Sequence, residues 1–463
     1  MKHSFILFNI IAAFLFTSCD KFLDIKPTGK VIARTGEEYR ALLTGVYANF
    51  PSDRSLTTLR TDEIKLDNTI DAIDYNTYFD IWVWNDASPS ENTATYSWRR
   101  FYHTIYIASY IIEKEGEIEE ASPADVSQLV GEAYMLRAYS YSILVNLFGK
   151  PYTKGNPSTD PGVPLLVKPD VETVLERSTV EQVYQQILSD IAMAKQRLNV
   201  DKWEDDFKYR FNKISADALM ARVCLYMGRW QESLDASKAV IEAYPELEDI
   251  STTGYTMPDN YKSKEAIVCL ERIPVWRKVA NDTSLPMIFM GFGYPDNNFV
   301  SSIVTGDLRK NRYVKAKTSQ VYEILKGNEK TAGIIECKST FRSAEFYLTA
   351  AEAAARLGDL NGAIDNYMTP MINNRYLAAR RTPTINAMKA MTQDQLIDAI
   401  LEDRRVELCF EGHRWFDLRR TTQQSITKKY GDDETYVLEE GDSRYTMLIP
   451  KEAISANPLL SQE

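Results

Sequence analysis

Apolar residues recur at intervals of three and four over long parts of the chain, which is the pattern of helices that bury one face. One such stretch covers residues 35–49, and Ser178–Thr179 supplies capping residues for a helix that begins at Val180. Similar spacing runs from Trp98 to Ile112 and from Ala124 to Phe148. The pattern predicts a mostly α-helical protein, with its helical core at about residues 34–50, 98–148, 178–246 and 339–420.

The clearest repetition is a pair of helices joined by a glycine turn. Apolar positions on both sides of Gly228 form the first copy, which Pro245 ends, and the same arrangement recurs around Gly358. Each turn glycine is followed five positions later by a small residue, Ser233 or Ala363, which lets two helices approach closely. These features are typical of a tetratricopeptide unit, which stacks on its neighbours to form a core. An ordinary pair of antiparallel helices is the alternative interpretation.

Three polar stretches interrupt the helices, at about residues 51–97, 249–338 and 421–450. The first shows little helical period and is expected to be an irregular loop with short ordered pieces. The second contains four prolines and a strand-like run, Ala266–Leu270, and the third ends in another expected strand, Met447–Pro450. Since long ordered loops tend to carry function, ligand contacts are expected in these stretches.

The stretch Leu401–Arg420 combines arginines, carboxylates and aromatic side chains more densely than a surface helix requires. Arg404 falls on the apolar face of its helix, with Glu407 within reach three residues later. Charges beside a core must be paired, because an isolated buried charge is costly. Glu407 and Glu411 lie one turn apart with His413 close by, which would also suit an acid–base or metal cluster. We favour a structural ion-pair network, because such networks are commoner than active sites.

The composition is that of a globular protein, since 44% of the 463 residues are hydrophobic and 26% are charged. The formal net charge of -11 argues against nucleic-acid binding, which normally needs a basic surface. Cys224, Cys269, Cys337 and Cys409 form no CxxC pair and are interpreted as small buried hydrophobic residues, with a disulfide among them left open. Because paired ligands are missing, no metal site and no cofactor is predicted.

The amino terminus has the layout of a secretory signal. Lys2 precedes an apolar run, Phe5–Phe16, that is shorter than the roughly 20 residues of a membrane-spanning helix. Small residues directly before Cys19 resemble a bacterial lipobox, although Phe16 stands where Leu is more usual. This predicts a lipoprotein signal peptide at residues 1–18 and lipid attachment at Cys19. A plain signal peptide cut nearby is the alternative.

Four motifs follow one another along nearly the whole chain. The mature start, Cys19–Pro27, reads CDKFLDIKP, and a helical block contains EAYMLRAY at Glu132–Tyr139 followed by Leu147–Gly149. The tail, Ile449–Gln462, is the last motif. The most specific one is EGHRWFDLR within Glu402–Arg420. Together the motifs resemble the SusD/RagB family of surface lipoproteins from Bacteroidetes. The structural signature residues are Arg404, Glu407, Glu411, Gly412, His413, Trp415, Phe416 and Asp417.

The resemblance implies a single domain at residues 19–463, with a tetratricopeptide-like helical scaffold, irregular insertions and a few short strands. It also implies a protein that is not an enzyme and is tethered by lipid to the extracellular face of the outer membrane. Members of this family act as a hinged lid on a SusC-like TonB-dependent transporter, to which they deliver a glycan or, in some members, an oligopeptide. Their helical-repeat face generally meets the transporter, and the irregular insertions shape the ligand pocket.

No family motif marks the ligand residues, so these are predicted from side-chain chemistry. Sugar rings present apolar C–H faces that stack on Trp and Tyr, while polar groups such as Arg60 and Asp62 fix the orientation. Each aromatic ring could instead pack within its own loop. The rival functions are a glycosidase that uses Glu407 and Glu411 and a tetratricopeptide adaptor that binds peptides. The aromatic candidates are Tyr75, Tyr78, Trp82, Trp84, Trp276 and Tyr294.

Overall fold

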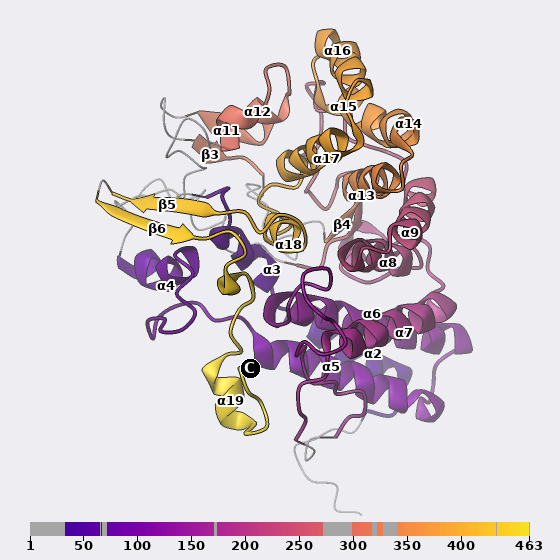
Figure 1. The fold of residues 1–463 in the computed structure, drawn as a ribbon. Coiled ribbons are helices and arrows are strands. Elements are labelled where there is room, and N and C mark those ends of the chain that lie inside the picture. Colours follow the sequence, from indigo (N-terminus) through magenta and orange to yellow (C-terminus); the bar gives the residue numbers. More distant parts are fainter. Residues whose placement is uncertain are drawn as a thin grey trace, which may run out of the picture.

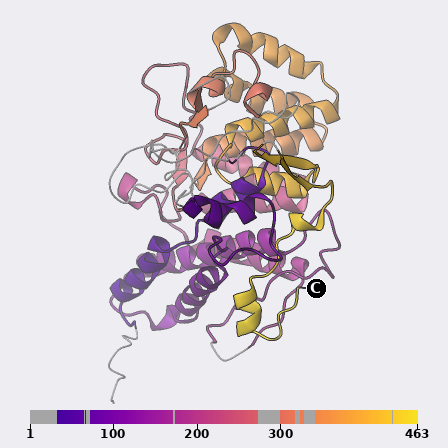
Figure 2. The same cartoon turned by 90° about the vertical axis from the view of Figure 1, so that its left-hand side faces the viewer.

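Helices form most of the protein, as the hydrophobic spacing predicts. The computed structural model describes residues 33–64, 66, 72–170, 174–271, 299–316, 322–326, 340–431 and 433–462. Figures 1 and 2 show an amino-terminal block of helices below and a carboxy-terminal block above, with the chain passing from one to the other through stacked helices. The predicted residues Cys19, Trp276, Tyr294 and Cys337 lie outside the described part of the chain.

The amino-terminal block consists of α2 (Gly36–Ala48), α5 (Trp98–Glu113), α6 (Pro123–Phe148) and α7 (Val180–Arg197). Thr179 caps α7, because its side chain accepts from the backbone N–H of Gln182. Almost the whole of α6 is buried, since α5 packs on one side of it and α7 on the other. These helices begin and end within a few residues of the predicted bounds.

Two tetratricopeptide-like pairs continue the stack. The first joins α8 (Ser215–Met227) to α9 (Trp230–Ala243), and Gly228 between them has a φ of 73°, a left-handed conformation that favours glycine. Ser233 is fully buried and its hydroxyl donates to the Ala221 carbonyl at 2.8 Å, which is the close helix approach that a small residue permits. The second pair turns at Gly358 and runs through α13 (Ser343–Arg356), α14 (Leu360–Gly362), the π-helical η5 (Ala363–Met368) and α15 (Thr369–Arg375).

The carboxy-terminal helices are α16 (Ala378–Lys389), α17 (Gln393–Glu407), α18 (Arg414–Arg420) and α19 (Lys451–Ala456). Helix α17 ends at Glu407, earlier than the expected stop at Gly412. Gly412 instead takes a φ of 74° in the turn that leads into α18. A Cβ there would collide with the Arg54 carbonyl oxygen, so glycine is needed at this close backbone approach.

The first polar stretch is more regular than predicted. It contains α3 (Asp53–Leu56), η2 (Thr57–Arg60) and the eleven-residue helix α4 (Ala72–Trp82). Tyr75, Tyr78, Phe79 and Trp82 are spaced i, i+3, i+4 and i+7, which is a helical pattern. The prediction of an irregular loop without helical period was therefore wrong for α4.

Strands are few and short, as expected. The predicted strand at Ala266 is β1 (Ala266–Val268), which pairs antiparallel with β4 (Phe341–Arg342). The other antiparallel pairs are β2 (Val314–Ala316) with β3 (Tyr322–Ile324) and the hairpin β5 (Ile426–Tyr430) with β6 (Glu434–Leu438). Met447–Pro450 is not a strand, because Met447 bonds to the α6 backbone and Ile449 to the Gln462 side chain. The minor helices are η3 (Glu115–Glu117), η4 (Asp205–Phe207), α11 (Phe299–Ser302), α12 (Arg309–Arg312) and η6 (Ser443–Tyr445).

Buried cysteines fill parts of this core, as the sequence predicts. Cys224, Cys269 and Cys409 are all buried. Among the helices that the structure describes, none combines the length and the apolar character needed to cross a membrane.

Candidate ligand-binding site

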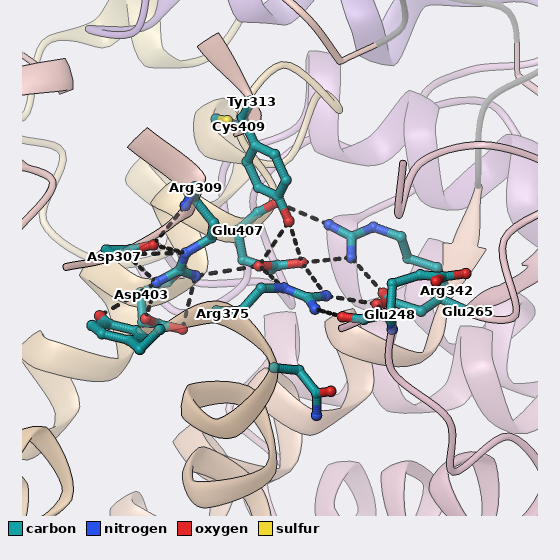
Figure 3. Close-up of polar contacts among 12 residues, drawn as sticks. Glu248, Glu265, Asp307, Arg309, Tyr313, Arg342, Arg375, Asp403, Glu407 and Cys409 are labelled. Carbon is teal, nitrogen blue, oxygen red and sulfur yellow. Dashed lines mark hydrogen bonds and ion pairs between the residues drawn. The ribbon is translucent and has the colours of Figure 1, made fainter. Parts of the chain in front are cut away.

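The carboxylate of Glu407 lies at the centre of a buried network of arginines (Figure 3). It accepts hydrogen bonds from Arg342 Nη1 at 2.8 Å, from Arg375 Nε at 2.9 Å and from Arg309 Nη1 at 3.3 Å. The hydroxyl of Tyr313 adds a donor at 3.2 Å. Because these donors come from β4, α15 and α12, one carboxylate joins three parts of the chain that are far apart in sequence.

Arg342 extends the network to two further carboxylates. Its Nε donates to Glu411 Oε2 at 2.9 Å, and its Nη1 reaches Glu265 Oε2 at 2.9 Å. Lys326 also pairs with Glu411, at 2.5 Å. All four side chains are at most 2% exposed. The two glutamates considered as a catalytic pair are thus both occupied by internal cations.

Electrostatics keep these carboxylates charged. Burial alone would raise the pKa of Glu407, but Arg375 and Arg342 outweigh it and hold the pKa well below its usual range. For Glu411 the same balance against Arg342 and Lys326 also lowers the pKa. Both groups are therefore permanent hydrogen-bond acceptors, and neither holds a proton to donate at neutral pH.

His413 is also part of the internal packing. Its Nε2 accepts from Arg54 Nη1 at 3.0 Å, and burial, followed by the positive charge of Arg54, holds its pKa well below the usual range. No group of three or more His, Cys, Asp or Glu side chains that could hold a metal occurs within the described residues.

A second chain of ion pairs connects α17 with α18. Arg404 pairs with Asp417 at 2.9 Å and not with Glu407, the carboxylate three residues later that the sequence suggested. Asp417 also pairs with Arg420, which binds Glu352 of α13 at 2.7 Å. These contacts fix the last helices of the signature against the tetratricopeptide-like unit.

Two of the predicted ligand contacts, Trp82 and Trp84, are inside the core. They are 0% and 1% exposed, and their indole N–H groups donate to the backbone carbonyls of Ile64 and Arg60. The ammonium group of Lys428 lies 5.2 Å from the Trp82 ring and 4.3 Å from the Trp84 ring. Neither indole presents a face to solvent in this arrangement, because the hairpin strand β5 covers them. Tyr78 is buried as well, at 7% exposure.

Tyr75 is the described aromatic candidate that reaches the surface. It stacks on Phe79 with ring centroids 4.4 Å apart, and it lies 5.7 Å from Tyr430 of the hairpin. Tyr436 on β6 meets the ring of Phe79 edge-on, with the ring centroids 5.6 Å apart. Tyr75, Tyr430 and Tyr436 are half-buried and together form a surface that we call the aromatic platform. Figure 1 shows α4 and the hairpin projecting together, away from the tetratricopeptide-like helices.

Tyr430 and Tyr436 are platform residues that the sequence analysis missed. They flank Gly431 and two aspartates between runs with alternating side chains, which is a hairpin signal that could have placed them on paired strands. Their proximity to Tyr75 depends on a contact between distant segments, which no local pattern reveals.

Comparison with known proteins agrees with this architecture. A family described as "Starch-binding associating with outer membrane" matches residues 21–225, and the SusD family matches residues 294–463. The chain belongs to the SusD/RagB-like family. SusD-like protein P38 of Formosa agariphila is 24% identical, over 89% of this chain and 90% of that protein. A SusD superfamily protein from Bacteroides fragilis has the same fold, with a TM-score of 0.74 and 22% identity over 93% of this chain and all of that one.

In this SusD-like protein, the predicted polar ligand contacts are engaged internally. Arg60 is fully buried and binds Asp86 through two hydrogen bonds of 2.7 and 2.8 Å. Asp62 pairs with Arg414 at 2.9 Å and with Arg405 at 3.3 Å. A ligand would therefore have to displace an ion pair to reach either residue.

Proposed function

We propose that the protein captures a glycan at the cell surface and delivers it to a SusC-like TonB-dependent transporter, for which it serves as a lid. The aromatic platform is the observation that carries the capture step. Half-buried tyrosines that reach the surface and are held by neighbouring rings suit the apolar faces of sugar rings. Membership in a family described as starch-binding and associating with the outer membrane supports both the ligand class and an extracellular, lipid-anchored location. A laminarin-binding SusD-like protein shares the fold, with a TM-score of 0.60 and 19% identity over 84% of this chain and 92% of that protein.

Among the aromatic residues predicted from the sequence and described by the structure, we propose Tyr75 as a direct ligand contact, together with Tyr430 and Tyr436. Trp276 and Tyr294 are proposed as further contacts from the second insertion. For Trp82, Trp84 and Tyr78 we propose a supporting role, because all three rings are buried and Lys428 of β5 lies over the two indoles. An oligopeptide is the alternative ligand, since tyrosine surfaces also suit peptide side chains and backbone.

Calorimetry against a panel of glycans and oligopeptides tests the capture step. We expect binding of a glycan to be weakened by Tyr75→Ala and by Tyr430→Ala, and to be unchanged by Tyr106→Ala, which removes a half-buried tyrosine from α5. If the protein binds peptides and no glycan, the proposed ligand is an oligopeptide and not a glycan. Equal binding by all of these variants would refute the platform as the site.

Two further experiments separate the rival functions. An outer-membrane barrel should co-purify with the protein from its native membrane, and failure to recover one would favour a tetratricopeptide adaptor. Hydrolysis of an oligosaccharide that is lost in Glu407→Gln would instead show a glycosidase, contrary to the internal role of that carboxylate.

A further inference from the structure

A concavity of about 500 Å³ lies at the amino-terminal end of α6, and its lining contains no residue of the aromatic platform. The first turns of α2 and α6 line one side of it, and the segment that follows α7 lines the other. The pocket lies at the opposite end of α6 from the contact with the carboxy-terminal signature. Gln128 lines the pocket, and eighteen residues later the carbonyl of Asn146 accepts a hydrogen bond from Arg419 of that signature. At 1.5 Å per residue the two are about 27 Å apart along the helix. The volume is within the range of about 300–1,000 Å³ that is typical of small-molecule sites.

Two arginines in the lining are held in place by one buried carboxylate. Glu132, which is fully buried behind the pocket, accepts from Arg40 Nη1 at 2.9 Å and from Arg210 Nη2 at 2.8 Å. Tyr47 and Gln128 also donate to Glu132, at 3.0 Å each. Glu132 engages Nη1 and Nη2 of Arg40 and Nε and Nη2 of Arg210. Among the described residues, Arg40 Nε and Arg210 Nη1 are guanidinium nitrogens that Glu132 does not engage and that can donate to a ligand, on side chains that are 27% and 14% exposed.

The pocket also contains an aromatic ring with a fixed orientation. Trp203 is half-buried, and its indole N–H donates to the Phe211 carbonyl at 3.1 Å. The Arg210 guanidinium lies 3.8 Å from the centre of its ring. A ring that is already oriented loses little freedom when a ligand stacks on it, which favours binding.

The charges of the lining select among ligands. The lining contains three exposed carboxylates, those of Glu37, Glu120 and Asp125. It also contains Arg40 and Arg210, and the single negative charge of Glu132 offsets one of their two positive charges. Negative charge therefore exceeds positive charge, which opposes an anionic ligand. A neutral polyhydroxylated ligand can use both the guanidinium donors and the carboxylate acceptors, while its C–H face covers the tryptophan.

We propose that this pocket is a second binding site, separate from the aromatic platform, for a short neutral oligosaccharide. Trp203 supplies the stacking surface, and Arg40 and Arg210 supply hydrogen-bond donors. The site goes beyond the proposed capture function and does not depend on it, because the two sites share no residue. With both sites occupied, the protein would hold two ligands, or two parts of a long one.

The test follows the indole N–H resonance of Trp203 in protein labelled with ¹⁵N-tryptophan, assigned by comparison with Trp203→Phe. Neutral oligosaccharides of glucose, mannose and xylose are titrated, with uronate and sulfated oligosaccharides as anionic probes. We expect a neutral oligosaccharide to shift this resonance, and Trp203→Ala to weaken its binding by about tenfold. Trp230→Ala is the matched control, because Trp230 is also half-buried under an arginine, with Arg356 4.7 Å from its ring.

Variants of the platform keep the two proposals distinguishable. The Trp203 shift should persist in Tyr75→Ala and Tyr430→Ala. The second site alone would be overturned if glycan binding measured by calorimetry is lost in the platform variants while the Trp203 resonance responds to no oligosaccharide. A response of Trp203 to anionic probes only would overturn the neutral-ligand assignment. Circular dichroism of each variant identifies misfolding. If Trp203→Ala misfolds, the test rests on the wild-type protein, in which a neutral oligosaccharide either shifts the Trp203 resonance or leaves it unchanged.

Discussion

Arg375 and Glu407 form a salt bridge at 2.9 Å in which both side chains are completely buried. Arg342 and Arg309 reach the same carboxylate, so that Glu407 links three internal cations. The other acidic partners of these arginines are Glu265, Glu411, Asp307 and Asp403. A buried pair of this kind need not add much stability when it is intact, but removal of one partner leaves uncompensated charge in the core.

Glu407→Gln should therefore lower the free energy of unfolding by about 3–5 kcal/mol, because the amide keeps the shape but cannot offset the arginines. Urea unfolding measures the change. Glu402→Gln is the control, since Glu402 lies on the same helix, is 43% exposed and pairs with Arg405 at the surface. A surface pair contributes about 0–1 kcal/mol, so equal effects of the two variants would contradict the role assigned to Glu407.

Trp415→Ala should lower the free energy of unfolding by about 3–5 kcal/mol, the usual cost of a large cavity in a core. Trp415 is fully buried, stacks on Tyr445 at 4.9 Å and lies 4.8 Å below the Arg60 guanidinium. Trp415→Phe should cost less, because it keeps an aromatic ring. Glycan affinity of the folded fraction should stay unchanged, and its loss at full stability would show that Trp415 takes part in recognition.

Stability should fall as pH rises through neutrality because of Glu63. Burial, followed by the charge of Asp62 beside it, raises the pKa of Glu63 to about 8. The folded protein keeps a proton that the unfolded chain loses above its lower pKa, so this stabilisation is present at low pH and disappears as pH rises through about 8. One such group changes stability by at most about 1.4 kcal/mol per pH unit.

Glu63→Gln imitates the protonated acid and should remove this dependence. We expect the variant and the wild type to have similar stability at pH 5 and the variant to become the more stable one as pH increases to 8, in denaturant unfolding at each pH. Parallel profiles would show that Glu63 is ionised in the folded protein. Asp53, whose pKa burial raises to about 7, contributes a slope of the same sign in both proteins.

Lys428→Met should loosen the hairpin that carries the aromatic platform. The Lys428 ammonium donates to the carbonyls of Leu59 at 2.6 Å and Trp82 at 2.9 Å, and burial holds its pKa well below the usual range. Met fills the space but leaves both carbonyls without this donor, which should cost about 1–3 kcal/mol. Glycan affinity should fall too, because Tyr430 lies two residues along β5. Thr427→Val, on the exposed face of β5, should change neither quantity.

Cys19→Ala should release the protein from the membrane fraction, since several acyl chains are needed to hold a protein on a bilayer. Fractionation of cells that express the variant, compared with Cys224→Ala as a control for a buried thiol, measures the effect. Continued tight membrane association of the Cys19 variant would disprove the lipobox.

Much of the fold could be predicted because helices and turns follow from local spacing. The bounds of α6, the capping of α7 by Thr179 and the glycine turn at Gly228 all depend on residues within a few positions of one another. The helix α4 was missed although its aromatic spacing is helical, because its polar composition was given more weight.

The candidate site was less predictable, because its geometry depends on contacts between distant segments. Composition alone could not show that Trp82 and Trp84 point inward under β5 while Tyr75 meets Tyr430 at the surface. Whether an aromatic residue forms core or binding surface depends on which element covers it.

The signature at Leu401–Arg420 shows the same division. The sequence by itself determined that a helix with an arginine on its apolar face is followed by a glycine turn and a second packed helix, because backbone geometry and hydrophobic period are local properties. Only the tertiary structure decided that Arg404 pairs with Asp417, while Glu407 binds arginines from β4 and α15. A buried charge takes the partner that the packed core brings within reach, and that choice is made by elements far away in the chain.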